Sequence, residues 1–243
     1  MNLKPVILFE DDDLVIVNKP ANYLTIPDRF RHEEPSILSW LKAKNEAIFV
    51  VHRLDKATSG ILCFAKNSES HKHLSKQFQE RTVDKIYWAL IDGQLMQKEG
   101  EINRPIAENM GKRGKMLVAR RGKPSLTLYK ALETFKDFEL VEATIKTGRT
   151  HQIRVHFQFV GHPLAVDAVY GKRSEFFLSE VKKKKYRGSK NEEERPLMKR
   201  TTLHSVKLSL DHPKTEERMV FQTELPKDFS ALLKQLRRWN GRR

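Results

Sequence analysis

Residues 52–60 read His52-Arg53-Leu54-Asp55-Lys56-Ala57-Thr58-Ser59-Gly60 and form the densest polar stretch of the chain. Apolar runs flank it, with Val50-Val51 before it and Ile61-Leu62-Cys63-Phe64-Ala65 after it. A short apolar run of this kind is typical of a buried strand, so we expect residues 52–59 to form a loop between two strands. Loops held at the edge of a rigid sheet often carry binding or catalytic groups. Local sequence equally allows that Asp55 and Thr58 only cap a turn.

Strand patterns dominate the rest of the chain. Residues 6–9 and 14–17 predict an opening hairpin, and further strand-like runs cover 86–91, 116–119, 125–132, 138–145, 203–210 and 219–221. Helical spacing favours helices over 36–44, over 67–80 and at the apolar positions Phe229, Leu232, Leu233 and Leu236, whereas residues 149–159 fit a helix or a strand. The chain therefore predicts an α+β fold, a mixed and largely antiparallel sheet with flanking helices, in a single domain over 1–243.

The charge balance predicts a polyanionic partner. Forty-six lysines and arginines against 31 acidic residues give a net charge of +15, which favours nucleic acid. Residues 172–200 are expected to form a basic, exposed insertion in which Lys183 and Lys184 contact phosphates, although solvated lysines often bind nothing specific.

Several classes of protein are excluded by composition. A single cysteine, Cys63, rules out an intramolecular disulfide and cysteine-rich zinc modules. No apolar run is long enough for a membrane span, and the N-terminal residues do not resemble a signal peptide. We therefore expect a cytoplasmic protein that does not bind membranes.

The polar stretch at residues 52–60 resembles the signature of the RluA-type pseudouridine synthases. Residues 17–20 are similar to the first motif of that family, 85–89 to its tyrosine motif and 148–156 to its arginine motif, all in the family's order. Further similarity follows at 161–171, 203–204 and 212–213, so the resemblance spans about residues 6–221. The chain departs from the pattern at Asn22 and Val166, where the family commonly has glycine. Because the motifs begin near residue 15, no preceding S4-type RNA-binding domain is expected.

This resemblance implies a pseudouridine synthase-like catalytic domain that isomerises uridine to pseudouridine in rRNA, tRNA or both, without a cofactor or metal. Asp55 is then the catalytic carboxylate, acting as a nucleophile or as a base. Arg154 matches the arginine that pairs with this aspartate, and Tyr87 matches the aromatic residue that stacks on the target base. The sequence leaves the route and the target RNA open.

A stacked uridine cannot present its reacting atoms to a carboxylate, so base flipping is expected. Arg53 is similar to a family arginine that reorganises RNA around the flipped nucleotide. The matching motifs also contain four residues that we assign to RNA contacts, His52, Lys19, Arg149 and His151. Ile153 is predicted to form an apolar floor beneath the base or to belong to the core. A monomer is the expected state.

Two other functions fit parts of the sequence. A metal-dependent nuclease would use His52, Asp55, His151 and His156, but the two last histidines are five residues apart and do not share one face of a helix. The second is a noncatalytic RNA-binding or ribosome-assembly protein on the same fold. The presence of Asp55, Tyr87 and Arg154 in their expected motifs argues against it.

Overall fold

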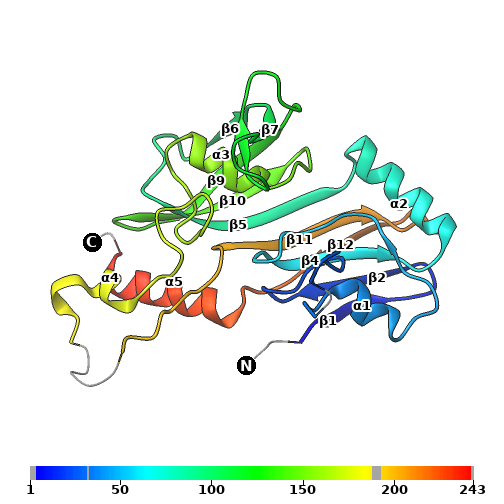
Figure 1. Cartoon of the computed structure of the whole chain (residues 1–243), viewed down its shortest axis with the longest axis horizontal. Coiled ribbons are helices and arrows are strands. Elements are labelled where there is room, and N and C mark those ends of the chain that lie inside the picture. Colours follow the sequence, from blue (N-terminus) through cyan, green and yellow to red (C-terminus); the bar gives the residue numbers. More distant parts are fainter. Residues whose placement is uncertain (1–3, 32, 188–192, 242–243) are drawn as a thin grey trace. The chain divides into compact units, whose positions relative to one another are not determined.

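The computed structural model describes residues 4–31, 33–187 and 193–241. The chain forms two compact units (Figure 1). Unit 1 comprises Met1–Tyr87 and His204–Glu224, and unit 2 comprises Trp88–Leu203 and Leu225–Arg243. The chain passes from one unit to the other within strand β5 (Asp84–Asp92) and at the start of strand β11 (Leu203–Asp211).

Unit 1 is built on a mixed sheet. The strands β1 (Val6–Glu10) and β2 (Leu14–Lys19) form the predicted antiparallel hairpin, and β2 pairs antiparallel with β4 (Ser59–Ala65). On its other side β4 pairs in parallel with β11, which pairs antiparallel with β12 (Arg218–Gln222). A two-residue strand, β3 (Phe49–Val50), pairs with the end of β4. The loop predicted over residues 52–59 is confirmed for 52–58, which lie between β3 and β4, whereas Ser59 is already the first residue of β4.

Strand β4 is buried along its whole length. Its alternate residues Ile61, Cys63 and Ala65 pack in one cluster with Leu14 of β2 and Leu74 of helix α2 (Ser68–Glu80). The predicted cap of α2 is confirmed, since the side chain of Asn67 accepts a hydrogen bond from the backbone of Ser70. The helix expected over 36–44 is α1 (Ile37–Lys42), capped in the same way by Ser36.

The start of β4 requires glycine. Gly60 has a φ of +118° and lies opposite Ser205 in the parallel pair of β4 and β11. A Cβ atom at position 60 would lie 2.2 Å from the carbonyl oxygen of Ser205. The last residue of the signature-like stretch is therefore glycine for a steric reason, because only glycine allows β11 to approach this closely.

Unit 2 contains an antiparallel set of β10 (Phe138–Ile145), β9 (Leu126–Thr134) and β6 (Glu99–Asn103), and a separate pair of β7 (Ile106–Glu108) and β8 (Met116–Val118). The ambiguous residues 149–159 resolve as helix α3 (Gln152–Phe159). The C-terminal helix α5 (Lys227–Trp239) buries the four apolar positions predicted from its spacing against residues that include Phe138 and Leu140. The α+β class and the largely antiparallel sheet are confirmed.

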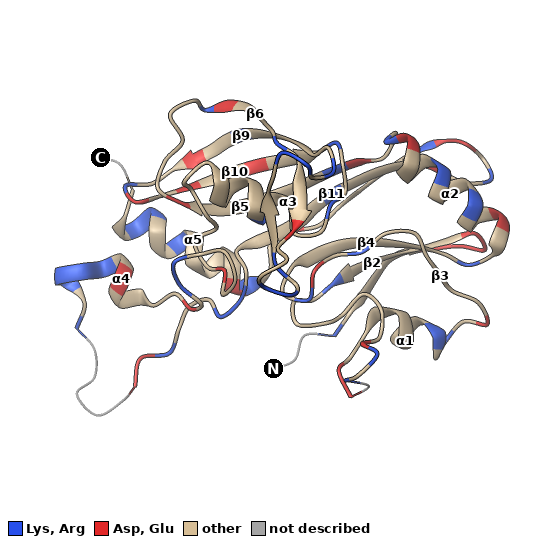
Figure 2. Ribbon diagram, turned by 45° about the horizontal axis from the view of Figure 1, so that its top comes forward, with Lys and Arg blue, Asp and Glu red and all other residues tan. Residues whose placement is uncertain are grey.

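The segment 172–200 is less exposed than its charge suggests. It contains α4 (Leu178–Lys182) and a 3₁₀ turn, η1 (Lys183–Lys185), and Phe176, Val181 and Met198 are buried in the core of unit 2. The prediction of an exposed insertion is wrong for these residues, because apolar residues near both ends of the segment, and Val181 in α4, pack into that core. Lysines cluster at α4 and the adjoining turn (Figure 2), and residues 188–192 lie outside the described part.

The expectation of a single domain over 1–243 stays a prediction, since two compact units can belong to one domain. Among the helices that the structure describes, none combines the length and the apolar character needed to cross a membrane.

Candidate active site

The loop of residues 52–60, called the signature loop from here on, begins at a neutral histidine. The Nε2 atom of His52 accepts a hydrogen bond from the backbone N–H of Cys63 (3.0 Å), and its ring stacks on Phe78 with the centroids 4.6 Å apart. Burial, with a smaller contribution from the charge of Lys85, lowers the pKa of His52 to about 3. The uncharged ring anchors the loop to β4, and the RNA contact assigned to His52 stays a prediction.

Thr25 holds the backbone immediately before Asp55. Its buried hydroxyl donates to the carbonyl oxygen of Leu54 (2.9 Å) and accepts from the N–H of the same residue (3.1 Å). One side chain thus satisfies both backbone groups of Leu54, as a neighbouring strand would. Sequence reasoning missed Thr25, because its partner lies 29 positions away and no local pattern announces the contact.

Lys19 and Asn22 hold the backbone immediately after Asp55. The Nζ atom of Lys19, which is fully buried, donates to the carbonyl oxygens of Pro20 (3.1 Å), Tyr23 (2.8 Å) and Lys56 (3.1 Å). The N–H of Asn22 donates to the same Lys56 oxygen (2.8 Å). The predicted RNA contact at Lys19 is corrected, because its ammonium group is occupied by carbonyls inside unit 1.

Asn22 explains one departure from the family pattern. Its φ is +67°, in the left-handed region that glycine and asparagine tolerate best. Asparagine can therefore occupy this position without a change in the path of the chain.

In unit 1, the negative charge of Asp55 acts on the pKa of the Tyr87 hydroxyl. Burial raises the pKa of Tyr87 well above its usual range, and the negative charge of Asp55 raises it further. A hydrogen bond to the side chain of Ser205 acts in the opposite direction. The Tyr87 hydroxyl is therefore protonated at neutral pH and can donate a hydrogen bond, while its ring is fixed in β5.

Unit 2 contributes a buried ion pair. The guanidinium group of Arg154 donates to both carboxylate oxygens of Asp167, from Nε (2.7 Å) and from one terminal nitrogen (2.9 Å), and it lies 4.9 Å from the ring centroid of Tyr170. The Arg154 charge and hydrogen bonds hold the pKa of Asp167 below its ordinary value, against the opposing effect of burial. This pair fixes the orientation of Arg154. Its predicted pairing with Asp55 stays a prediction.

The other predicted site residues differ in how they are engaged. His151 hydrogen-bonds the Tyr170 hydroxyl (2.8 Å), and Arg149 Nε donates to the carbonyl oxygen of Pro124 (3.2 Å). Ile153 is buried in α3, whereas Arg53 is exposed in the signature loop. Their assigned contacts with RNA or with the base stay predictions.

Three of the lysines in the run 182–185 have partners within the protein that sequence reasoning did not foresee. Lys183 forms an ion pair with Asp137 (2.7 Å), and the ammonium groups of Lys182 and Lys185 lie 5.0 Å and 5.9 Å from the ring centroid of Trp239. Lys184 is exposed. The phosphate contacts assigned to Lys183 and Lys184 stay predictions, and Lys183 would have to leave Asp137 to make one.

The histidines of the nuclease hypothesis all hydrogen-bond within the protein. Beside His52 and His151, His156 bonds to the Thr127 hydroxyl through Nδ1 (2.9 Å) and to the carbonyl oxygen of Arg104 through Nε2 (3.0 Å). Each ring is therefore accounted for as a structural group.

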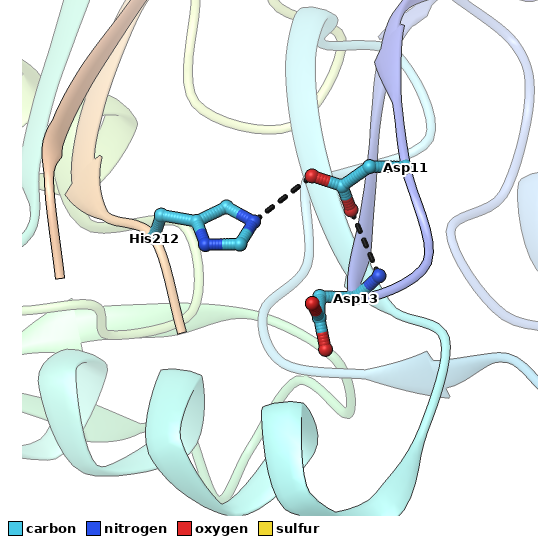
Figure 3. A group of neighbouring side chains, drawn as sticks. All are labelled: Asp11, Asp13 and His212. Carbon is cyan, nitrogen blue, oxygen red and sulfur yellow. Dashed lines mark hydrogen bonds and ion pairs between the residues drawn. The ribbon is translucent and has the colours of Figure 1, made fainter. Parts of the chain in front are cut away.

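Among the described residues, one group has side chains close enough to surround a cation: Asp11, Asp13 and His212 (Figure 3). Their ligand atoms are already engaged. His212 Nε2 donates to Asp11 (2.9 Å), while its Nδ1 accepts two amides of the following turn. Asp13 accepts hydrogen bonds from Ser70 (2.7 Å) and Asn67 (2.9 Å), which lower its pKa. The group ties the β1–β2 turn to α2 and to the end of β11.

Comparison with known proteins identifies the family. The family model described as RNA pseudouridylate synthase matches residues 13–159. Ribosomal large subunit pseudouridine synthase D of Nitrosomonas europaea is 36% identical over 236 residues, which are 95% of this chain and 65% of the relative. Its namesake in Pseudomonas aeruginosa is 36% identical over 237 residues, which are 95% of this chain and 71% of the relative. This chain belongs to the RNA pseudouridylate synthase family.

The family fold extends through both units. The solved structure of human RNA pseudouridylate synthase domain containing 4 aligns with a TM-score of 0.71 at 26% identity, over 95% of this chain and 92% of the human one. Within the family-matched region lie Asp55, Tyr87 and Arg154. Two of their neighbours, Asp167 and Ser205, lie beyond it, and sequence reasoning did not assign them a role.

Replacing Thr25 by valine should loosen the signature loop. The substitution keeps the shape but leaves the buried N–H and C=O of Leu54 without their partner, which costs about 1–3 kcal/mol. Hydrogen exchange of the Leu54 amide should become faster in Thr25→Val and stay near the wild-type rate in Thr25→Ser, which retains the hydroxyl. Equal protection in all three proteins would contradict the role given to Thr25.

The neutral state of His52 predicts a loss of stability in acid. Because its folded pKa of about 3 lies below the ordinary value of 6.5, the unfolded chain binds more protons between these two values. The stabilisation is complete above pH 6.5 and is lost as the pH falls toward 3, by at most about 1.4 kcal/mol per pH unit.

Urea unfolding at a series of pH values, compared between the wild type and His52→Gln, measures this contribution. Glutamine keeps an acceptor for the Cys63 amide but does not titrate. The stability difference between the two proteins should shrink as the pH falls below 6.5. A difference that does not change with pH would refute the assignment.

Proposed function

We propose that this chain isomerises uridine to pseudouridine in large-subunit ribosomal RNA. The observation that carries the proposal is the placement of Asp55: Thr25 and Lys19 hold the backbone on either side of it, and its charge contributes to the raised pKa of the buried Tyr87 phenol. The rRNA target rests on the names of the relatives in Nitrosomonas europaea and Pseudomonas aeruginosa. The expected monomeric state and cytoplasmic location belong to the same proposal.

In the proposed reaction the N1–C1′ bond of the target uridine breaks, the uracil turns, a C5–C1′ bond forms, C5 loses its proton and N1 gains one. Asp55 begins the reaction as a nucleophile or as a base toward the ribose. Tyr87 offers a ring face for the flipped uracil and a protonated hydroxyl for its polar atoms. Arg154, which Asp167 orients, is the arginine that the family resemblance assigns to the charge of the Asp55 carboxylate.

We propose that RNA phosphates bind to residues 104–123 of unit 2, called the basic hairpin from here on. It contains seven lysines and arginines and a single glutamate. Within the described part of the chain, none of these seven side chains forms an ion pair. The backbone is ordered, since Asn109 N–H donates to the carbonyl of Lys115 (2.8 Å) and Lys123 N–H to that of Ile106 (2.8 Å). Cations of this kind on an ordered hairpin suit the phosphate backbone.

A noncatalytic RNA-binding protein is the alternative that remains. It would use the same basic hairpin and the same fold, and it differs in one measurable respect: it would bind RNA without converting uridine.

Tritium release from 5-³H-uridine-labelled RNA tests the proposed reaction, because C5–C1′ bond formation displaces the label. The wild type should release tritium from a large-subunit rRNA transcript in the presence of a metal chelator. Asp55→Asn should be slower by about a hundredfold or more at unchanged stability, because the amide is neither base nor nucleophile. Tight binding without release from rRNA or tRNA transcripts would favour the noncatalytic protein.

The salt dependence of RNA binding tests the hairpin. Replacing Lys112, Arg113, Arg120 and Arg121 by alanine should weaken binding and reduce the slope of log K against log[salt] by about 0.7–0.9 for each phosphate that the variant no longer neutralises. The matched variant, Lys183→Ala with Lys184→Ala, should change the slope less, since Lys183 is paired with Asp137. Equal slopes for wild type and the hairpin variant would place the phosphate-binding residues elsewhere.

A further inference from the structure

Residues 26–31 and 33–35 belong to an arm on unit 1, and this arm carries an exposed aromatic side chain. Its base is closed by backbone hydrogen bonds, from Leu24 N–H to the carbonyl of Pro35 (3.0 Å) and from Leu38 N–H to that of Thr25 (3.1 Å). In Figure 2 the arm projects beside α1 and carries both blue and red segments. A closed base gives the arm a fixed origin in the fold, as in compact surface loops of this size.

The tip of the arm is a preformed turn that presents a ring to solvent. The Asp28 carboxylate accepts hydrogen bonds from the N–H groups of Phe30 (2.8 Å) and Arg31 (3.0 Å), the geometry of an aspartate-capped turn. The Phe30 side chain is 86% exposed, and both of its neighbours, Arg29 and Arg31, are exposed as well. An exposed aromatic ring gains no free energy from the removal of its apolar surface from water until a partner covers it.

The arm is connected to both neighbours of Asp55. At its base, Thr25 holds the Leu54 backbone. Farther along, the Glu34 carboxylate bridges Lys56 Nζ (2.8 Å) and the Arg31 guanidinium (3.1 Å). A ligand whose reacting nucleotide lies at Asp55 therefore passes close to the arm.

The chemistry of the tip fits unpaired nucleotides. A ring flanked by two guanidinium groups offers a stacking face for a base and charge for the adjoining phosphates, the combination that single-stranded RNA uses. The exposed Arg53 adds charge on the signature loop, whereas Arg31 and Lys56 are both paired with Glu34 and would have to leave it to meet a phosphate. Of the acids of the arm, Asp28 caps the turn and Glu34 pairs with these two cations, while Glu33 is exposed.

Resting on the proposed function, we propose that Phe30 is a stacking platform for an unpaired base of the substrate RNA beside the flipped uridine, with Arg29 and Arg31 on the flanking phosphates. The arm then selects RNA in which a neighbour of the target uridine is unstacked. A fully paired neighbour cannot present a face to the ring.

Substitution of Phe30 separates stacking from simple burial. Phe30→Ala should weaken binding of an rRNA transcript that the wild type converts, by about five- to a hundredfold. Phe30→Trp should retain affinity, and its added fluorescence should be quenched by the transcript. Phe30→Leu should behave like alanine rather than tryptophan. The matched control is Met96→Trp, at a fully exposed position of unit 2, which should show no quenching.

The outcomes distinguish this inference from the proposed function. Wild-type affinity in Phe30→Ala together with no quenching in Phe30→Trp, while the wild type releases tritium, overturns the platform and leaves the isomerase intact. Quenching and weakened binding without tritium release by the wild type support the platform and count against the isomerase. Quenching by fully paired RNA as strong as that by the transcript overturns the selection of unpaired bases.

Discussion

A buried ammonium group closes the loop that carries Asp55. Taking the charge of Lys19 out of water is expensive unless its donors are satisfied. The carbonyl oxygens of Pro20, Tyr23 and Lys56 supply that satisfaction. If the loop moved away, the buried ammonium group would lose one of its carbonyl acceptors while still out of water. The free-energy cost of that loss restrains the backbone of the loop. With Thr25 on the preceding residue, it holds Asp55 between two fixed peptide groups.

Other buried polar side chains of the candidate site also have hydrogen-bond partners inside the protein. His52 stays neutral because a positive charge there would be desolvated and would face Lys85. Arg154 is charged at any physiological pH, and Asp167 fixes its orientation by accepting two of its hydrogen bonds. In both cases hydrogen-bond partners inside the protein fix the geometry of a buried polar group. Asp55 and Tyr87, which we propose to act on the substrate, lie on a loop held by Thr25 and Lys19 and on strand β5.

Local sequence patterns predict much of the fold. The features that they do not predict were missed for a common reason. The loop at 52–59, the capped helix α2 and the apolar face of α5 follow from local periodicity. Lys19 and His52 were assigned to RNA because they lie in the motifs that resemble the family. In the structure they bond to backbone groups that tertiary folding brings near, carbonyls for Lys19 and an amide for His52, and no local pattern of side chains identifies such partners. The same holds for Thr25, whereas Phe176 and Met198 lie in a segment that was interpreted from its overall charge.

Unit 1 is built from two stretches that lie far apart in the sequence, and this affects how the protein folds. The parallel pairing of Ser59 with His204 joins residues 145 positions apart. Contacts of such long range slow folding, because the entropy of closing the intervening chain is lost before the contact repays it. On the ribosome, the strand beside Gly60 emerges only after nearly all of unit 2. The enzyme site is thus among the last features to be completed, and a nascent chain carries Asp55 long before it has the neighbours that make it useful.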